Sequence, residues 1–500
     1  MMSRLKRYSK WYLLFAPLKS YIRSVWQLFL VVIVGNLLKK DLSFSKDARF
    51  YFYCLLAAVG IFLLFFIYHL LCYFTQTYEL TAESFIFRKG IFKKQELIIP
   101  YERIQTIKQQ QWIIMIPLGL VRLMIETAAS SGNEAEIDLP FVPQSLYEEL
   151  ENYRKQGYGK SLSGTHSSKK ALYSLSAREL LVFALTELSL FTPIIFMFAL
   201  LEVIPEPLQE QLFGQVSELI WMITVLLFVL LYVLFAILSI GKTILQYANF
   251  SIYQENNDAL RIEHGLIEQK SQVIPANKIQ GIRIKQGIIS HMLGLVSVDL
   301  LLAGGQEKQA DEKSAQTNQP YLLPLIPTAK LQQYLSQFVP EYADEFDLQS
   351  VKEQRLWYFT RFKLFAVVLP VGLYLIFDFA WWWLLLSIAI LLALSMIYAS
   401  FQSKLQAYGM SSKLLCFQQI HLAECQKVIV QRKNIQSLEI RTSRWLYPKK
   451  FAHCKISVKA GNGDFSSQLS YLPLEAIDEI SSFYRLKRKE RAIFDDSTNC

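Results

Sequence analysis

Long apolar runs divide the chain. Four of them, at residues 50–74, 180–203, 216–240 and 379–400, each have about the 20 residues that a helix needs to cross a ~30 Å hydrocarbon core. Two shorter runs, at 24–38 and 364–377, are flanked by basic residues whose long side chains can reach the interface. The pattern predicts six membrane-spanning helices in three hairpins. Either short run could instead form a re-entrant or interfacial helix.

The segments that follow the hairpins have a different pattern. After the first hairpin, short β-branched and aromatic runs such as 84–90 and 120–127 are separated by Gly, Pro and polar turns. A helical pattern with Leu146 and Leu150 on one face comes next. The same order returns after the other two hairpins. We therefore predict, for each segment, six or seven antiparallel strands in a small curved sheet or partly open barrel, closed by a C-terminal helix.

One phrase recurs in these segments. The stretch IPYERIQTIK at 99–108 returns as IPANKIQGIRIK at 274–285, and more faintly as VQRKNIQSLEIR at 430–441. Gly90 and Gly265 lie 175 residues apart, as do Gly119 and Gly294, so the first two copies align without a gap. The third copy aligns at an offset of 331 residues and has His421 in place of the first glycine. Three copies are therefore predicted, the third of them diverged.

The phrase is interpreted as a fold-building element. Pro100 separates two strands, and strict alternation would place Ile104, Thr106 and Lys108 on one face and Gln105 and Ile107 on the other. Gly90 is expected to adopt a positive φ in a hairpin. The alternative is a shared ligand-contacting role for Arg103, Gln105 and Lys278.

These motifs resemble a known family. A Tyr-x-Leu-Thr start, then Gly, Ile-Pro, Arg-Ile-Gln and Leu-Gly-Leu, is similar to the bacterial pleckstrin-homology-like (PH-like) domain that occurs next to transmembrane helices. The three-copy layout resembles YdbT-like membrane proteins. The resemblance is strong over 78–127, good over 250–302 and weak over 406–459. It implies a fold of seven strands and a capping helix, and it supplies no catalytic residues.

The predicted fold class is therefore an α+β membrane protein with six transmembrane helices in three hairpins, each followed by a PH-like β-sandwich or barrel with a C-terminal helix. The boundaries are these: basic N-terminus and first hairpin 1–75, first PH-like domain 76–154, linker 155–177, second hairpin 178–242, second PH-like domain 246–340 with a mobile loop at 304–320, third hairpin 355–402, third PH-like domain 404–486 and tail 487–500.

Charge predicts the orientation. The first 24 residues carry six basic and no acidic side chains, whereas the loop at 202–214 has three glutamates and no basic residue. Positively charged segments stay on the cytoplasmic side during insertion. Both termini and all three PH-like domains are therefore predicted to be cytoplasmic in a multi-pass protein of the bacterial inner membrane, with an uncleaved N-terminus. The basic loop at 39–49 runs against this assignment.

The sequence offers no enzymatic motif. No phosphate-binding loop, dinucleotide fingerprint, zinc-protease helix or nucleophile elbow occurs, and the six histidines are scattered singly. The six cysteines have no metal-type spacing and are interpreted as reduced structural thiols. We therefore expect no enzyme activity, no catalytic residues, no cofactor and no metal. The net charge of +10 fits a membrane surface, and no nucleic acid partner is expected.

Some residues stand out as candidates for interactions. Arg88, Lys89, Lys93 and Lys94 cluster at a hairpin near the end of the first apolar pair, where they could attract anionic lipid, bind a specific headgroup or form an ordinary solvated turn. The apolar run at 111–120 is expected to join the domain core or pack on the helices, with membrane contact or protein binding as alternatives. A basic tail at 485–491 could be solvated or bind a surface.

Two functional hypotheses follow. The first is a non-enzymatic membrane scaffold whose PH-like domains bind a protein or anionic lipid; the resemblance implies a small, single-repeat membrane protein of the same family as a partner, besides membrane lipids. The second is a transporter or export component with Glu187, which lies within an apolar run, as its intramembrane polar site. The alternative for Glu187, favoured over a transport role, is a structural hydrogen bond to Thr186, to Ser189 or to another helix.

Overall fold

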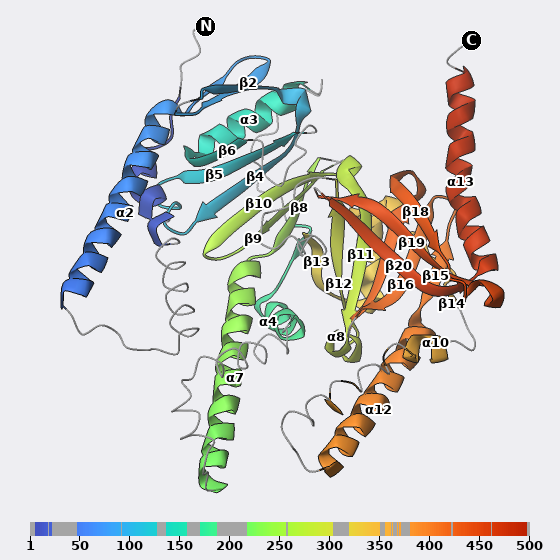
Figure 1. The fold of residues 1–500 in the computed structure, drawn as a ribbon. Helices are drawn as coiled ribbons and strands as arrows, with labels where there is room; N and C mark the ends of the chain where they lie inside the picture. Colours follow the sequence, from blue (N-terminus) through green and yellow to red (C-terminus); the bar gives the residue numbers. More distant parts are fainter. Residues whose placement is uncertain are drawn as a thin grey trace. The chain divides into compact units, whose positions relative to one another are not determined.

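The computed structural model describes most of the chain, and its elements are drawn in Figure 1. The residues described are 6–18, 20–22, 48–91, 93–127, 137–157, 171–187, 218–256, 259–303, 320–350, 356–361, 363, 368, 370–371, 381–421, 424–461 and 463–497. The chain divides into two compact units. Unit 1 is Met1–Ser130, Ala135–Asn257 and Arg261–Val273, and unit 2 is Ser131–Glu134, Asp258–Leu260 and Ile274–Cys500.

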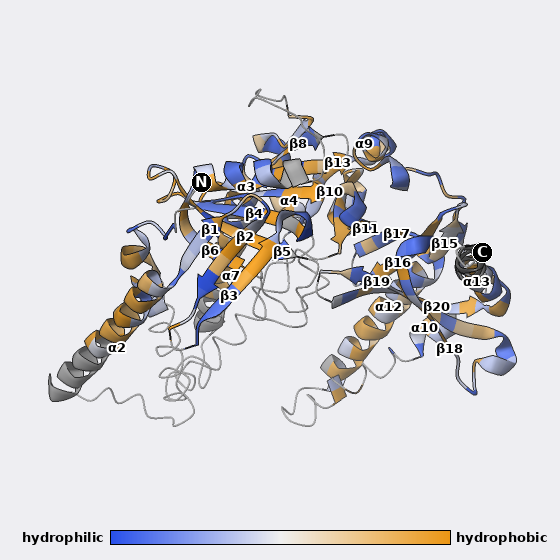
Figure 2. Ribbon diagram, turned by 90° about the horizontal axis from the view of Figure 1, so that it is seen from above, coloured by the Kyte–Doolittle hydropathy of each residue, from blue (hydrophilic) through white to orange (hydrophobic). Residues whose placement is uncertain are grey.

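Three long apolar helices precede the β-rich segments. They are α2 (Ala48–Thr75), α7 (Glu218–Tyr247) and α12 (Trp381–Leu405). Within them, Val229–Tyr247 and Leu384–Leu405 are long and apolar enough to cross a membrane, and Val59–Thr75 is a shorter apolar stretch. Hydrophobic residues dominate α2 and α12 in Figure 2. The predicted helix at 24–38 lies outside the described residues, as do 188–203 and most of 364–377.

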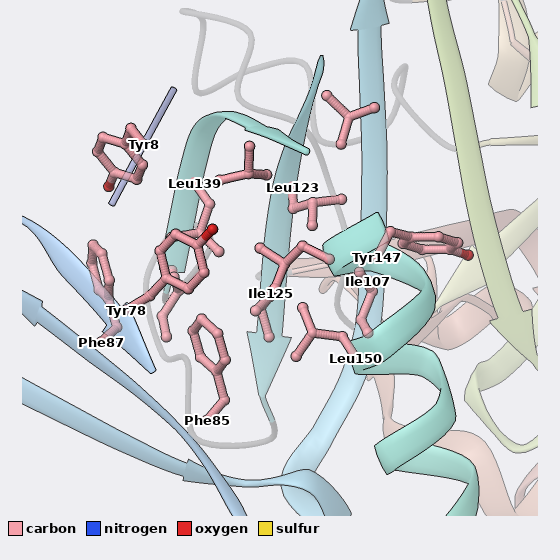
Figure 3. Packing of buried hydrophobic residues seen from close by; sticks show 14 of the residues in the cluster. Tyr8, Tyr78, Phe85, Phe87, Ile107, Leu123, Ile125, Leu139, Tyr147 and Leu150 are labelled. Atoms are coloured by element: carbon pink, nitrogen blue, oxygen red, sulfur yellow. The ribbon is translucent and has the colours of Figure 1, made fainter. Parts of the chain in front are cut away.

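Unit 1 contains the first copy. Its strands are β1 (Thr77–Leu80), β2 (Ser84–Lys89), β3 (Gln95–Pro100), β4 (Ile104–Trp112), β5 (Leu120–Thr127) and β6 (Ile137–Pro143), followed by α3 (Gln144–Gly157). β1, β2 and β3 form one antiparallel sheet, and β4, β5 and β6 belong to another. Phe85, Ile107, Ile125 and Leu150 are completely buried in the core, where side chains from both sheets and from α3 meet (Figure 3). The six strands and the helix agree with the predicted fold.

The sheet of β4 continues into the second copy. It has seven strands in the order β6-β5-β4-β10-β9-β8-β7, which adds β7 (Tyr173–Ser174), β8 (Ser251–Asn256), β9 (Ala259–His264) and β10 (Glu268–Pro275). β10 pairs with β4 along Glu268↔Trp112 to Gln272↔Lys108. This contact between copies is called the first junction below.

Unit 2 repeats the arrangement. Its first sheet has the order β13-β12-β11-β17-β16-β15-β14, and its second is β18-β19-β20. Its elements are β11 (Ile279–Gly287), α8 (Ile288–Met292), β12 (Leu295–Leu302), β13 (Tyr321–Pro327), α9 (Leu331–Phe338), β14 (Gln349–Ser350), α10 (Leu356–Thr360), β15 (Ala407–Met410), β16 (Leu414–His421), β17 (Glu424–Gln431), β18 (Ile435–Arg441), β19 (Phe451–Ala460), β20 (Gly463–Pro473) and α13 (Leu474–Ser497). β11 of the second copy pairs with β17 of the third, which is called the second junction.

The two junctions have one register. Glu268 pairs with Trp112 in the first, and Glu424 pairs with Gly287 in the second. Subtracting the repeat offsets makes both glutamates equivalent to Lys93 (268 − 175 and 424 − 331), and makes Gly287 equivalent to Trp112 (287 − 175). The third strand of a later copy therefore meets the fourth strand of the preceding copy in the same way twice.

In each copy, the edge formed by the first strand is extended by a short segment from before the long apolar helix. Lys6 forms an isolated bridge with Tyr78 of β1, and Tyr173 of β7 pairs with Ile252. In the third copy, Gln349 of β14 pairs with Tyr408. β7 lies inside the stretch predicted as a linker. The chain therefore begins each PH-like domain before the long apolar helix and completes it afterwards.

The repeated phrase builds one local structure in every copy. A 3₁₀ turn follows the third strand, and Ile104, Ile279 and Ile435 are buried directly after it. The ladder then shifts at a β-bulge, between Ile104 and Thr106 in the first copy and at the equivalent place in the others. The bulge corrects the predicted alternation, because Ile104 and Ile107 are both buried. The fold-building interpretation is confirmed.

Glycines occupy the sharp turns. Gly90 and Gly265 have φ values of 117° and 107°, and a Cβ on Gly90 would lie 1.9 Å from the carbonyl oxygen of Lys93. The positive φ predicted for Gly90 is confirmed. Gly119 and Gly294 have φ near 62° and 65°, and Lys450, at the equivalent place in the third copy (119 + 331), has a φ of 57°. The backbone turn survives there without the glycine.

Candidate membrane-facing site

The basic hairpin lies at the end of a long apolar helix. α2 ends at Thr75, and Thr77 pairs with Arg88 at the root of the hairpin between β2 and β3. Lys93 and Lys94 are exposed at its tip. The hairpin therefore lies beside the C-terminal end of α2, a position at which positive charge would be attracted to anionic headgroups if α2 enters a membrane.

The four basic residues of this hairpin are not equivalent. Arg88 Nη2 lies 2.8 Å from Glu96 Oε1, and Nη1 lies 3.2 Å from Glu79 Oε2, so two carboxylates compensate its charge. Within the described part of the chain, Lys89, Lys93 and Lys94 form no ion pair. The sequence candidates thus reduce to three lysines that could act on a lipid surface.

The corresponding hairpin of the second copy is bonded to α7. The backbone N–H of Leu266 donates to the carbonyl of Leu245 at 2.9 Å, and that of Gly265 donates to Ala248 at 2.7 Å. Leu266 and Ile267 are 45% and 49% exposed beside the helix end. The second copy thus presents apolar side chains where the first presents lysines.

In unit 1, the loop after the fourth strand of the first copy contacts the hairpin of the second copy at Ile267. Ile113, Ile114 and Ile116 are 54%, 50% and 41% exposed, and the N–H of Ile113 donates to the carbonyl of Ile267 at 2.8 Å. Met115 is only 6% exposed and belongs to the core. The core prediction for the run at 111–120 is therefore correct for Met115 and wrong for the three isoleucines, because the turn directs them away from the sheets.

The equivalent loop of the second copy lies near the end of α12 in unit 2. Gly287 pairs with Glu424, which also pairs with His421 of β16. Gln418 of β16 donates from Nε2 to the carbonyl of Leu405, the last residue of α12, at 2.8 Å. The loop carries exposed apolar side chains, namely Ile288, Ile289, Met292 and Leu293. A second apolar loop therefore lies level with the end of a long apolar helix.

In the third copy this loop is aromatic and basic. Leu446 is buried against Tyr358 and Ala399 of the helices α10 and α12, while Trp445 and Tyr447 beside it are 80% and 66% exposed. Lys449 Nζ lies 5.4 Å from the centre of the Tyr358 ring. Trp and Tyr with nearby basic residues are typical of the boundary between hydrocarbon and water.

A polar cavity of about 370 Å³ lies beside the first junction. Basic and acidic side chains line this cavity, among them Arg261, Lys270, Glu148 and Glu263. Arg261 is held by Glu255 at 2.8 Å, so its charge is already compensated. Among the described residues, no group of three His, Cys, Asp or Glu side chains could hold a metal ion. The cavity has no arrangement of groups typical of catalysis.

The described cysteines are free. Burial raises the pKa of Cys416 and of Cys454 to about 12, so both thiols are protonated at neutral pH. Cys72 and Cys425 are free as well, the side chain of Cys54 is not described, and Cys500 lies outside the described residues. These thiols fit the predicted structural role.

The other sequence candidates are dispersed. Glu187 is the C-cap of α4 (Ala177–Thr186), with its N–H bonded to the carbonyl of Phe183, and the run after it is outside the described residues. Arg103 and Lys278 end equivalent 3₁₀ turns in different units. Burial, and then the charge of Lys459, lowers the pKa of Lys278. The side chains of Gln105 and of the basic tail from 486 are not described, although the tail backbone continues α13.

Comparison with known proteins defines the class. The model of the bacterial PH domain family matches residues 28–157 and 199–339, which is more than half of the chain. The chain therefore belongs to the bacterial PH domain family and is a membrane protein with repeated PH domains. It is 27% identical over 434 residues to the UPF0699 transmembrane protein YdbT of Bacillus subtilis strain 168, covering 82% of this chain and 84% of that protein. No solved structure gives a significant match.

The family match covers the first two copies, and the evidence for the third copy comes from the structure. The third copy lies outside the matched residues, yet β15 to β20 and α13 repeat the order of β1 to β6 and α3. The junctions were not found by sequence reasoning. In the sequence, the strands that form the junctions have the pattern of ordinary core strands. The one signal for a junction was that the third and fourth strands keep nearly the same lengths in every copy.

Proposed function

We propose that this protein is a non-enzymatic integral membrane scaffold that presents three linked PH-like domains on the cytoplasmic face of the bacterial inner membrane. The domains bind a protein partner there, and anionic lipid strengthens the attachment. The observation that carries the proposal is the backbone pairing across each hairpin. Lys6 with Tyr78, Tyr173 with Ile252 and Gln349 with Tyr408 join the residues before a hairpin to those after it.

This pairing supports an even number of crossings per hairpin. Two segments that share backbone hydrogen bonds lie on one side of a membrane, because the hydrocarbon layer cannot separate bonded strands. In the proposed arrangement, each hairpin contains one long described apolar helix and a second crossing that returns the chain, six crossings in all. The junctions and the three-residue turn at Ala276–Lys278 then keep all three copies on the same face.

The loops at the helix ends support contact with the leaflet. Within each unit, exposed apolar or aromatic side chains lie beside the end of a long apolar helix, and the lysines of the first hairpin add charge. Each basic residue near an anionic surface contributes about 1 kcal/mol. In the proposed arrangement, these loops rest in the interface while the outer faces of the sheets remain open to a protein. A small single-repeat membrane protein of the same family is the proposed partner.

Cysteine labelling tests the topology. Single cysteines at Glu83, Lys330 and Lys413, one in each copy, are exposed in the structure and suit a chain whose native cysteines have been replaced. A membrane-impermeant thiol reagent should label none of them in intact cells and all three after permeabilisation. Labelling of any one from outside would overturn the common cytoplasmic face.

A photoreactive anionic lipid in nanodiscs tests the lipid part. Replacing Lys89, Lys93 and Lys94 with Gln should reduce lipid capture at the first hairpin several-fold at low salt, because attraction of surface charges is screened by ions. Replacing Lys330 and Lys413 with Gln is the matched control and should leave capture unchanged. Equal capture by both variants would remove anionic lipid from the proposal.

The transporter hypothesis remains a prediction with its own test. If Glu187 is an intramembrane polar site, Glu187→Gln should abolish rescue of a deletion strain while the protein still inserts and accumulates. The scaffold proposal expects full rescue, since the described Glu187 serves as a helix C-cap.

A further inference from the structure

The pairing pattern of the two junctions leaves two strand edges without a neighbouring strand among the described strands. Each junction joins the third strand of one copy to the fourth strand of the preceding copy. β3 is the last strand of the sheet β1-β2-β3, and β18 is the last strand of the sheet β18-β19-β20. Among the described strands, neither edge has an outer neighbour. Open edges present unpaired backbone donors and acceptors.

The β3 edge exposes a residue that is buried in the other copies. Ile98 is 61% exposed, whereas its equivalents Val273 (98 + 175) and Ile429 (98 + 331) are 1% and 4% exposed. All three occupy the same place in the third strand. The difference is that the strands of Val273 and Ile429 are covered by a preceding copy.

The β18 edge shows the same contrast. Ile440 is 43% exposed, whereas its equivalent in the second copy, Ile284 (440 − 156), is 6% exposed in the second junction. A β-branched residue exposed on an open strand edge is a hazard that proteins usually avoid with charge or proline. Ile98 on β3 and Ile440 on β18 therefore both occupy positions that pairing with another strand would cover.

We propose that a second molecule of this chain completes both edges, with β18 of one molecule pairing with β3 of the next in the register of the internal junctions. That register places Leu438 opposite Ile98, where the second junction pairs Ile282 with Ile429. The contact is heterologous, so each added molecule keeps one open edge, and association continues as a row or closes into a ring.

The chain itself points to a second copy as the occupant. It supplies both halves of a contact that it already makes twice, and the register opposes no like charges. Lys94 would face Thr442, Gln95 would face Arg441 and Glu96 would face Ile440. Like charges directly opposite would weaken such a pair. The inference rests on the proposed function in one respect, which is that both edges must lie on the same membrane face.

Disulfide crosslinking in native membranes tests the register. One molecule carries Ile98→Cys and another, with a different tag, carries Leu438→Cys, both without native cysteines. Residues directly opposite in antiparallel strands have Cα atoms about 4.5–5.5 Å apart, which suits a disulfide. Mild oxidation should give a dimer that contains both tags. Pairing Ile98→Cys with Glu439→Cys, one residue out of register, should give at least tenfold less.

An internal crosslink controls for folding. Gln286 lies opposite Cys425 in the second junction, so Gln286→Cys in a chain that retains only Cys425 should form an intramolecular disulfide under the same conditions. If it forms and the Ile98–Leu438 dimer does not, the inference is overturned. Equal yield at Glu439, or crosslinking of Ile98→Cys only to a different protein, also overturns it. Thiol labelling of all three copies from outside would count against the cytoplasmic orientation alone, since the dimer can still form when all copies share the opposite face. Labelling of only some copies would count against the inference as well.

Discussion

The first and second junctions share a register but not a chemistry. The first pairs β10 with the polar strand Lys108-Gln109-Gln110-Gln111, and Lys108 is held by Glu126 at 2.9 Å. The second pairs β11 with β17 through Ile282 and Ile429, and buries a charge cluster beside them. The carboxylate of Asp299 is fully buried and accepts from Arg283 at 2.6 Å and from Lys285 at 2.7 Å.

This contrast indicates what sets the register. If side-chain complementarity set it, two such different pairings would not be expected to align identically. The junctions have in common the 3₁₀ turn, the β-bulge and the lengths of the β-hairpins, and all three are features of the backbone. Register is pinned by turn geometry where side chains leave it open. The side chains then decide how strongly each junction holds.

The largest expected effect comes from Asp299→Asn. It removes the buried carboxylate that pairs with Arg283 and Lys285, and breaking a buried ion pair costs about 3–5 kcal/mol. Hydrogen exchange should show the amides of β11 and β17 opening more easily by that amount. Asp138→Asn, which breaks the half-exposed pair with Arg122, is the control and should change exchange by less than about 1 kcal/mol. Similar effects of the two would contradict the contrast.

Gly281→Thr should weaken the second junction by about 1–3 kcal/mol through overpacking. A Cβ there would lie 2.9 Å from both the carbonyl oxygen of Ile429 and the Cγ1 of Val430. The first copy has Thr106 at the equivalent place, beyond the pairs that β10 forms with β4. The reverse change, Thr106→Gly, should cost only about 0.5–1 kcal/mol, the ordinary cost of glycine in a strand. Exchange of β17 amides measures the first change and exchange of β5 amides the second.

Lys450→Gly should stabilise the third copy by about 1 kcal/mol, because a residue with a side chain is strained at positive φ. Gly119→Ala is the mirror experiment in the first copy and should destabilise it by a similar amount. Thermal unfolding in detergent, followed by cysteine accessibility at Cys454 for the third copy, measures the change. A loss of stability on Lys450→Gly would show that the lysine side chain contributes more than the turn costs.

The smallest effect is expected from Lys270→Gln in the first junction. Gln426 holds the equivalent position in the second (270 + 156), so the swap makes the two junctions more alike. Half-exposed polar substitutions usually change stability by less than about 0.5 kcal/mol. Exchange of β4 and β10 amides should remain the same within that range, and a larger change would assign Lys270 a role in holding the copies together.

Sequence reasoning predicted local features better than connections between copies. The positive φ of Gly90 followed from the need for a tight turn, and the strand order followed from alternating patterns. The prediction that Ile104 and Ile107 lie on opposite faces was wrong, because a β-bulge adds one residue to the strand between them. The alternation of residue types does not reveal this bulge. β7 was missed because two residues in a polar stretch have no periodicity. The junctions depend on which strand edges meet, which no local pattern records.

The short segments before the hairpins have a consequence for how the protein is made. Tyr173 and Ile252 are neighbours in the finished sheet but are separated along the chain by the segment that contains α7. The ribosome releases Tyr173 before α7, so the edge strand stays unpaired until the residues that follow α7 have been made. A hairpin that fails to insert leaves its domain with an unsealed sheet. Completion of this sheet edge therefore depends on residues from both sides of α7.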